Sequence, residues 1–390
     1  MLMNLNSHHY FSKIAAAGLC LSMLSMTSCG LIEMRDSYEE TTKEEVNTAM
    51  MLAPAERVNE VEVRTEILPE TVVEEEVPKT VLTFTAAGDI RIDDAIIADA
   101  ANRAAEGSTY SFLRMYSGVY RAVHDSDVAV GRYSTASSPY SADNTASEDK
   151  STPIESLAAL AEMGFEVLDT TGSDTADDYS DDMTEYGIGN LHASLTGEQG
   201  VYTVEQDGIT LAFLATDGTS KNVLLKSMDY AKSVSDVIVV SVDWKDGTTE
   251  KQKKNFAGIL AGAGADIILG SDDVLGSAEW VDTGDGSPAL VVYSLGNFAA
   301  TADTAEALCG GILSLDITFC EGEISLENVC VEPTIVHYGA DSRNYQIFRL
   351  SSYTSDISAS HAVEGLDIDV LADRVGEILD DEFLPSDFQD

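Results

Sequence analysis

Beyond the first eighty residues, apolar runs of strand length alternate with amphipathic stretches of helix length, and this alternation restricts the fold more than any other feature. Residues 81–87 form a mainly apolar run typical of a buried strand, and residues 93–105 have the spacing of a helix. The strand 237–242 and the helix 249–263 repeat that order, whereas the chain after residue 266 consists mainly of strands. Strands that alternate first with helices and later with other strands predict a layered α/β domain with a mixed sheet.

Glycine, proline and polar residues mark the limits of the other predicted elements. Pro153 opens a helix, and Gly164 closes it before the next strand. Asp207-Gly208 separates the two strands of a predicted hairpin. These further elements are helices at 110–124, 154–163 and 365–384, and strands at 127–130, 165–170, 201–204, 209–215 and 266–269.

Ligand sites of α/β sheets lie at the carboxyl ends of the strands, so the residues directly after each predicted strand are the candidates for function. Five of the six strand ends selected in this way present acids or amides. The sequence therefore predicts a polar, mainly acidic site where the strand ends meet. The candidate pocket residues are Asp89, Arg132, Ser134, Ser173, Asp174, Asp177, Asp243, Asp272, Asp273 and Asn297.

The charge of the chain excludes several classes of partner. There are 22 Lys and Arg against 68 Asp and Glu, a formal net charge of −46, yet 44% of the residues are hydrophobic. That apolar content is enough for a packed core, so the chain is not an acidic disordered protein. Nucleic-acid binding requires a basic face and is excluded, and direct docking on anionic lipid is disfavoured. Cations, neutral ligands and basic surfaces remain as partners.

The N-terminus has the pattern of a secretion signal. Residues 1–28 contain no acid and one basic residue, Lys13, followed by an apolar run over residues 14–26 that is too short to span a bilayer. Small residues then precede Cys29, a pattern that resembles a bacterial lipobox, in which the cysteine is lipidated. We therefore expect an extracytoplasmic lipoprotein held at the cell membrane by Cys29. An ordinary signal peptide with a chance cysteine is the alternative.

Residues 29–80 are expected to be an acidic, disordered stalk. Residues 33–80 contain 14 acidic and 5 basic residues, no glycine, and apolar residues without a helical or strand period. Such a segment cannot bury enough apolar surface to offset the entropy lost on ordering. The predicted organisation is thus a signal peptide (1–28), the stalk (29–80), a folded domain (81–338), and a C-terminal extension (339–390) with a helix and an acidic tail.

The cysteines of the body give no disulfide framework. Cys309, Cys320 and Cys330 are an odd number, so they cannot all pair within the chain. Cys320 and Cys330 flank a predicted hairpin turn at residues 321–323, where they could form a disulfide. The sequence leaves this pairing open.

Four motifs give the chain from about residue 81 to residue 333 a family resemblance. They are Gly88-Asp89-Ile90, the segment 164–167, the segment 264–270, and Tyr293-Ser294-Leu295-Gly296-Asn297-Phe298. In this order and spacing they resemble the CapA (poly-γ-glutamate capsule synthesis) family of the metallophosphatase superfamily. The resemblance implies a metallophosphatase-like α/β fold, a layered α-β-β-α sandwich of mixed sheets.

The metal-ligand motifs of that family are largely replaced. Arg132-Tyr133-Ser134 stands where an Asn-Leu-Glu motif is expected, and Gly172-Ser173-Asp174 stands for Asn-Asn-His, with the following family aspartate kept as Asp177. Asp243-Trp244-Lys245 replaces a histidine before tryptophan and glycine, and Gly270-Ser271-Asp272-Asp273 replaces a histidine-rich motif. Imidazoles are the ligands that hold transition metals at such centres, so phosphoesterase activity of the usual kind is not expected.

Two interpretations of the altered site remain open. A metal site could be rebuilt from Asp89, Asp174, Asp243, Asp272 and Asp273, whose oxygen ligands suit Ca²⁺, Mg²⁺ or Mn²⁺. Alternatively the site holds no metal or other cofactor, and the Arg132 guanidinium supplies the positive charge that neighbouring carboxylates require. We favour the second interpretation, because aspartate is a common replacement in an acidic protein.

The resemblance implies a role in capsule or surface-polymer biogenesis. With the metal ligands replaced, we expect a non-catalytic accessory or binding protein whose partners are the membrane, through its lipid anchor, and a surface polymer or the capsule machinery. A polyanionic polymer is repelled by a chain of this charge unless cations bridge the two. The alternative function is a metal-dependent hydrolase with an all-carboxylate site.

Overall fold

The computed structural model describes residues 79–388, apart from residues 136–151, 173–179, 219–220 and 285–286. All of these residues belong to the unit Glu75–Asp390. The predicted signal peptide, almost all of the stalk, and the candidate residues Cys29, Ser173, Asp174 and Asp177 lie outside the described residues. The stalk was predicted to extend to residue 80, whereas strand β1 already begins at Lys79.

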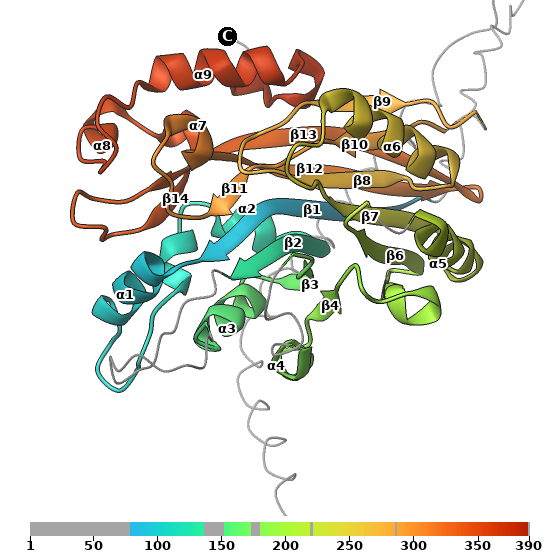
Figure 1. Cartoon of the computed structure of the whole chain (residues 1–390), viewed down its shortest axis with the longest axis horizontal. Helices are drawn as coiled ribbons and strands as arrows, with labels where there is room; N and C mark the ends of the chain where they lie inside the picture. Colours follow the sequence, from blue (N-terminus) through green and yellow to red (C-terminus); the bar gives the residue numbers. More distant parts are fainter. Residues whose placement is uncertain (1–78, 136–151, 173–179, 219–220, 285–286, 389–390) are drawn as a thin grey trace, which may run out of the picture. The chain divides into compact units, whose positions relative to one another are not determined.

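Two mixed sheets form the centre of this unit (Figure 1). The first has the strand order β14-β13-β12-β1-β2-β3-β4, with β11 paired to β1, and the second has the order β5-β6-β7-β8-β10-β9. The strands of the first sheet are β1 (Lys79–Ile92), β2 (Val128–Thr135), β3 (Phe165–Asp169), β4 (Gly189–Leu191), β11 (Asn297–Ala299), β12 (Cys309–Cys320), β13 (Glu323–His337) and β14 (Gln346–Arg349). Those of the second are β5 (Tyr202–Gln206), β6 (Ile209–Thr216), β7 (Val237–Asp243), β8 (Ile267–Ser271), β9 (Ala278–Val281) and β10 (Ala289–Val292).

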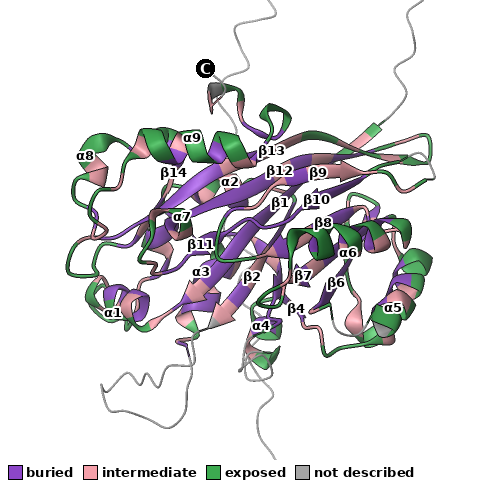
Figure 2. Cartoon of the chain, turned by 45° about the horizontal axis from the view of Figure 1, so that its top comes forward, coloured by how far each residue is buried: buried purple, intermediate pink, exposed green. Residues whose placement is uncertain are grey.

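The two sheets pack face to face through a common apolar core. Strand β6 shows how the sequence produces this arrangement, because alternate residues point to opposite faces of a strand. Leu211 and Phe213 belong to the core shared with the first sheet, whereas Ala212 and Leu214 belong to a second apolar cluster on the outer face. Both faces are therefore covered, which explains why this strand is a continuous apolar run in the sequence. Figure 2 shows the buried strands between exposed helix surfaces.

Helices cover the outer faces, so the predicted α-β-β-α sandwich is confirmed. Residues of α5 and α6 pack on the second sheet, and residues of α1 and α3 join the core of the first. Helix α5 was not anticipated from the sequence. None of the helices in the described part of the chain is both long and apolar enough to cross a membrane. The helices are α1 (Asp94–Asn102), α2 (Tyr120–His124), α3 (Glu155–Glu162), α4 (Ser180–Glu185), α5 (Lys221–Val234), α6 (Glu250–Gly262), α7 (Ala305–Leu308), α8 (Ser355–Ser358) and α9 (Ile368–Ile378).

One predicted helix, residues 110–124, is wrong as a single element. The segment forms a short 3-10 helix, Leu113–Tyr116, and then α2. Gly118 lies at the break, where an added Cβ would stand 2.3 Å from the carbonyl oxygen of Ile347. The close approach of strand β14 at this glycine accounts for the interruption.

The C-terminal residues are part of the same folded unit rather than an appended extension. Strand β14 pairs with β13 in the first sheet, with Val336 opposite Ile347. Helix α9 is shorter than the predicted 365–384, and its residues Leu371 and Val375 are buried in the common core. The segment therefore contributes to the stability of the sandwich.

The hairpin between β12 and β13 is confirmed, but its cysteines do not pair. Cys320 lies opposite Glu323 at the turn, and Cys330 lies opposite Ser314, several residues along the strands. Because strands rise about 3.3 Å per residue, this register separates the two cysteines by far more than the roughly 4–7 Å between Cα atoms that a disulfide requires. None of Cys309, Cys320 and Cys330 forms a disulfide in the described part of the chain.

Candidate functional site

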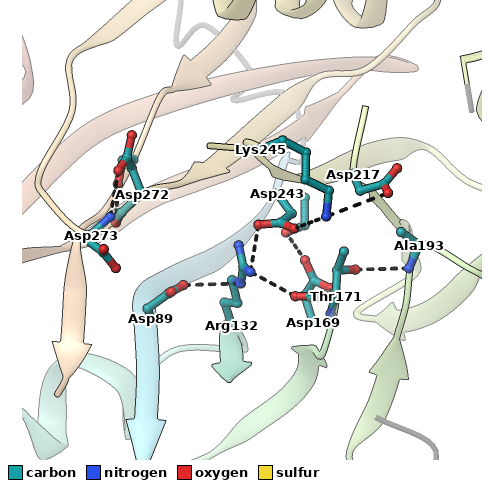
Figure 3. Close-up of polar contacts among 12 residues, drawn as sticks. Asp89, Arg132, Asp169, Thr171, Ala193, Asp217, Asp243, Lys245, Asp272 and Asp273 are labelled. Carbon is teal, nitrogen blue, oxygen red and sulfur yellow. Dashed lines mark hydrogen bonds and ion pairs between the residues drawn. The ribbon is translucent and has the colours of Figure 1, made fainter. Parts of the chain in front are cut away.

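Strands from both sheets bring the candidate residues to one edge of the sandwich (Figure 3). Strands β1, β2 and β3 are parallel neighbours, and their register places Asp89 beside Arg132 and Arg132 beside Asp169. Strand β7 of the second sheet ends at Asp243, whose side chain faces this row. The predicted meeting of the strand ends is therefore observed for Asp89, Arg132 and Asp243.

The guanidinium of Arg132 occupies the centre of the site. Its Nη2 lies 2.8 Å from Oδ1 of Asp243 and donates a hydrogen bond of 2.9 Å to the carbonyl oxygen of Thr171, while its Nε lies 3.4 Å from Oδ1 of Asp89. The side chain is only 12% exposed. Burial opposes its charge, but Asp89, Asp169 and Asp243 together raise the pKa of Arg132 above its ordinary value. Arg132 thus joins the two sheets as a permanent cation.

Asp169 is a member of this site that the sequence analysis missed. It is 2% exposed, and its carboxylate accepts hydrogen bonds from Oγ of Ser241 at 2.5 Å and from the backbone N–H of Thr171 at 2.8 Å. The residues after each strand were the predicted candidates, whereas Asp169 is the last residue of β3 itself. An aspartate directly after the buried Val167 and Leu168 was the available signal.

Asp89 is buried between two arginines, with Nε of Arg132 3.4 Å from its Oδ1 and Nη2 of Arg91 3.8 Å from its Oδ2. Burial raises its pKa to about 6, although Arg132 and Arg91 act in the opposite direction. Oδ1 of Asp89 and Nε of Arg132 form no hydrogen bond with a described residue, so their contact is an ion pair without a directed bond. The ionised form of Asp89 is therefore only partly stabilised.

Each of the other candidate aspartates that the structure describes has its own cation. Lys245 Nζ lies 3.1 Å from Asp243. Arg91 Nη2 lies 2.6 Å from Oδ1 of Asp273. Nη2 of Arg91 also lies 3.8 Å from Oδ2 of Asp89, so Arg91 links Asp273 to the site. Asp272 pairs instead with Lys253, whose Nζ lies 2.9 Å from its Oδ2 (Figure 3).

The two remaining described candidates have supporting positions. Nδ2 of Asn297 donates hydrogen bonds to the carbonyl oxygens of Asp273 at 2.9 Å and Ala307 at 2.8 Å, which fixes the loop that carries Asp273. Oγ of Ser134 is buried and has no hydrogen-bond partner among the described residues. Neither side chain is arranged as a nucleophile or a base.

The free space at this site is small. A cavity of about 40 Å³ is lined by glycine and apolar residues from both sheets and by the polar residues Asp89, Arg132, Asp169, Ser241 and Ser271. A buried water needs about 10–15 Å³, so the space between the described residues has room for a few waters.

The side chains present do not fit the transition-metal centre that the family resemblance implies. Among the described residues there is no group of three or more histidines, cysteines or acids that could hold a metal ion. No described histidine forms a hydrogen bond or an ion pair with Asp89, Asp169 or Asp243, and a guanidinium lies between these carboxylates. Asp174, part of the predicted carboxylate set, lies outside the described residues.

The raised pKa of Asp89 predicts a pH dependence of stability. A carboxyl group with a higher pKa in the folded state than in the unfolded state stabilises the fold while it is protonated, and this contribution is lost as the pH rises from about 4 to 6. In Asp89→Asn this loss, about 2 kcal/mol, should disappear. Urea unfolding of both proteins from pH 4 to pH 7 measures their free energies of unfolding. The difference between the two proteins cancels the effects of other titrating groups such as Glu166 and His337, which both proteins share. Asp125→Asn, at a side chain 66% exposed, is the control and should follow the wild type. A constant difference between wild type and Asp89→Asn would contradict the assignment.

One of three comparisons with known proteins agrees with the predicted family. Residues 196–302 match the family described as "Bacterial capsule synthesis protein PGA_cap", a segment that includes Asp243, Asp272, Asp273 and Asn297. This match confirms the resemblance and relates the chain to capsule synthesis. The crystal structure of a hypothetical protein from Thermus thermophilus is similar over 65% of this chain and 100% of that chain, with 14% identity and a TM-score of 0.41. A comparison with curated protein sequences gave no match.

Proposed function

We propose, on the premise that the chain belongs to the bacterial capsule synthesis family, that it is a non-catalytic accessory or binding protein in the biogenesis of a surface polymer of the poly-γ-glutamate type. The position of Arg132 carries this proposal. Its guanidinium lies between Asp89 and Asp243 and compensates the carboxylates from within the chain. A site closed by a tethered cation has no need of a metal, and it has no open coordination position for a substrate.

The charge of the protein limits how it meets such a polymer. With a net charge of −46, the chain repels a polyanion in solution, so a direct contact requires bridging cations or a basic partner protein. An accessory role toward other components of the capsule machinery agrees with this charge better than binding of the free polymer.

Metal analysis of the purified protein tests the non-catalytic role. We expect the full chain, purified without chelator and dialysed against Mn²⁺, Ca²⁺ or Mg²⁺, to retain less than stoichiometric metal by plasma mass spectrometry, and to leave a generic phosphodiester substrate unhydrolysed. The matched control is the double variant Asp89→Asn, Asp243→Asn, which should show the same background. One equivalent of a divalent ion that is lost in this double variant would instead establish the rebuilt carboxylate site and favour a hydrolase.

The lipid anchor is tested at Cys29. We propose that this residue is lipidated and holds the protein at the extracytoplasmic face of the membrane. In cells that express the full chain, Cys29→Ser should abolish incorporation of labelled palmitate and move the protein from the membrane fraction to the soluble fraction. Cys20→Ser, a cysteine inside the apolar run, is the control and should leave both properties unchanged. Unaltered palmitate labelling in Cys29→Ser would rule out this anchor.

A further inference from the structure

A second cavity, of about 520 Å³, lies against helix α9 and shares no lining residue with the cavity at Asp89. Its walls come from the start of α6, the loop that follows β8, the region of α7, and one side of α9. Figure 1 shows α9 along the same side of the sandwich as α7. Sites for small molecules in proteins have volumes of roughly 300–1,000 Å³, so this cavity has the size of a ligand site.

The inner wall of this cavity is apolar. Leu371 and Val375, one helical turn apart on α9, are 4% and 2% exposed, and they face Leu275 and Cys309 of the body, which are 5% and 4% exposed. Val370, the residue before Leu371 on α9, is 61% exposed and does not line the cavity. An apolar group in the cavity would therefore displace water from an apolar wall whose side chains are almost fully buried.

Most charges around the cavity neutralise one another. Both cations of the lining form ion pairs. Nζ of Lys253 lies 2.9 Å from Asp272 and 3.1 Å from Glu250. Nη1 of Arg374 lies 2.7 Å from Glu377. Neither cation is therefore available to bind an anionic ligand.

One carboxylate of the cavity lining has no cation paired with it among the described residues. Glu306 lines the cavity and forms no ion pair with any described residue. The pKa of the Cys309 thiol is raised to about 12. Burial is the larger cause, and the negative charge of Glu306 is the second. The cavity thus combines an apolar wall with a surplus of two negative charges, because Glu306 has no paired cation among the described residues and Glu250 and Asp272 share Lys253.

We propose that this cavity binds an amphipathic cation, a small molecule with an apolar body and an amine, whose ammonium group pairs with Glu306 while the apolar part contacts α9. The lining carries four carboxylates against two cations, and the whole chain is strongly acidic, so both the local and the overall charge favour a cation over an anion. This site is independent of the role proposed for Arg132.

Three probes with the same alkyl chain and different charge test the proposal: n-octylammonium, n-octanol and n-octanoate, titrated calorimetrically into the full chain. We expect saturable 1:1 binding of octylammonium, weaker binding of octanol, and none of octanoate. Octanoate binding as tight as that of octylammonium, equal binding of octanol and octylammonium, or no saturable binding of any probe would each overturn the proposal.

Two variants locate the binding. Glu306 is exposed, so Glu306→Gln should weaken octylammonium about 2–5-fold, as expected for one exposed ion pair, and leave octanol unchanged. Val274→Trp, which enlarges a lining side chain that is already 41% exposed, should weaken both probes about tenfold by excluding part of the alkyl chain. The matched controls, Glu364→Gln and Val370→Trp, lie outside the lining and should bind as the wild type does. Unchanged octylammonium binding in Glu306→Gln or in Val274→Trp would place the probe elsewhere and refute this assignment.

Discussion

Replacing Arg132 with methionine is expected to lower the free energy of unfolding at pH 7 by about 3–5 kcal/mol, the usual cost of removing one partner from a buried ion pair. Methionine fills much of the same space, so the loss reports the charge rather than a cavity. Asp89 and Asp243 would remain 7% and 12% exposed without the cation that lies between them. Chemical denaturation at constant ionic strength measures this change.

The pH dependence of this loss separates charge from packing. At pH 5 the destabilisation should be smaller than at pH 7, because Asp89, whose pKa burial already raises to about 6, accepts a proton when its cation is removed. The control is Lys245→Met, which removes a cation 3.1 Å from Asp243 at a side chain 51% exposed and should cost no more than about 1 kcal/mol. A loss in Arg132→Met that is equal at both pH values, or no greater than that in Lys245→Met, would contradict a central role for the guanidinium.

The fold was accessible from the sequence because its signals are local. Strands such as β7 are apolar on both faces, which marks them as central strands of a covered sheet, and Gly164 adopts a positive φ of 94° at the end of α3 as its helix-closing position predicts. Helix α5 has a less apolar composition, since lysines and polar residues fill its exposed side, and its pattern was overlooked. The break at Gly118 depends on β14, more than 200 residues later in the chain, and no local pattern could reveal it.

The site was predictable only in part. The rule that polar residues gather at strand ends identified Asp89, Arg132 and Asp243, whose strands are neighbours or face one another across the sandwich. It could not separate them from Asp272 and Asp273, because the turn of the loop after β8 decides which cation each carboxylate meets. Pairing with Lys253 and Arg91 depends on contacts between distant elements, which a sequence without its fold does not contain.

The motif Gly88-Asp89-Ile90 contacts the motif 293–298 at Gly88, where the two backbones approach closely. Gly88→Ala should lower the free energy of unfolding by about 3 kcal/mol, the upper end of the usual cost of overpacking. A Cβ at this position would lie 2.2 Å from the carbonyl oxygen of Gly296 and 2.7 Å from that of Leu295. Both obstacles are backbone atoms, and the N–H of Asp89 donates a 2.8 Å hydrogen bond to the same oxygen of Gly296. Relief of the clash must therefore separate β1 from β11 and move Asp89.

Gly258→Ala is the matched control for this substitution, because an added Cβ at that exposed position of α6 meets nothing within 4 Å. Alanine is favoured over glycine inside a helix, so this variant should be about 0.5–1 kcal/mol more stable than the wild type in the same urea titration. Opposite signs for two identical chemical changes would show that Gly88 is required for close backbone approach. Equal effects would mean that the strands yield easily, and that the position of Asp89 does not depend on this contact.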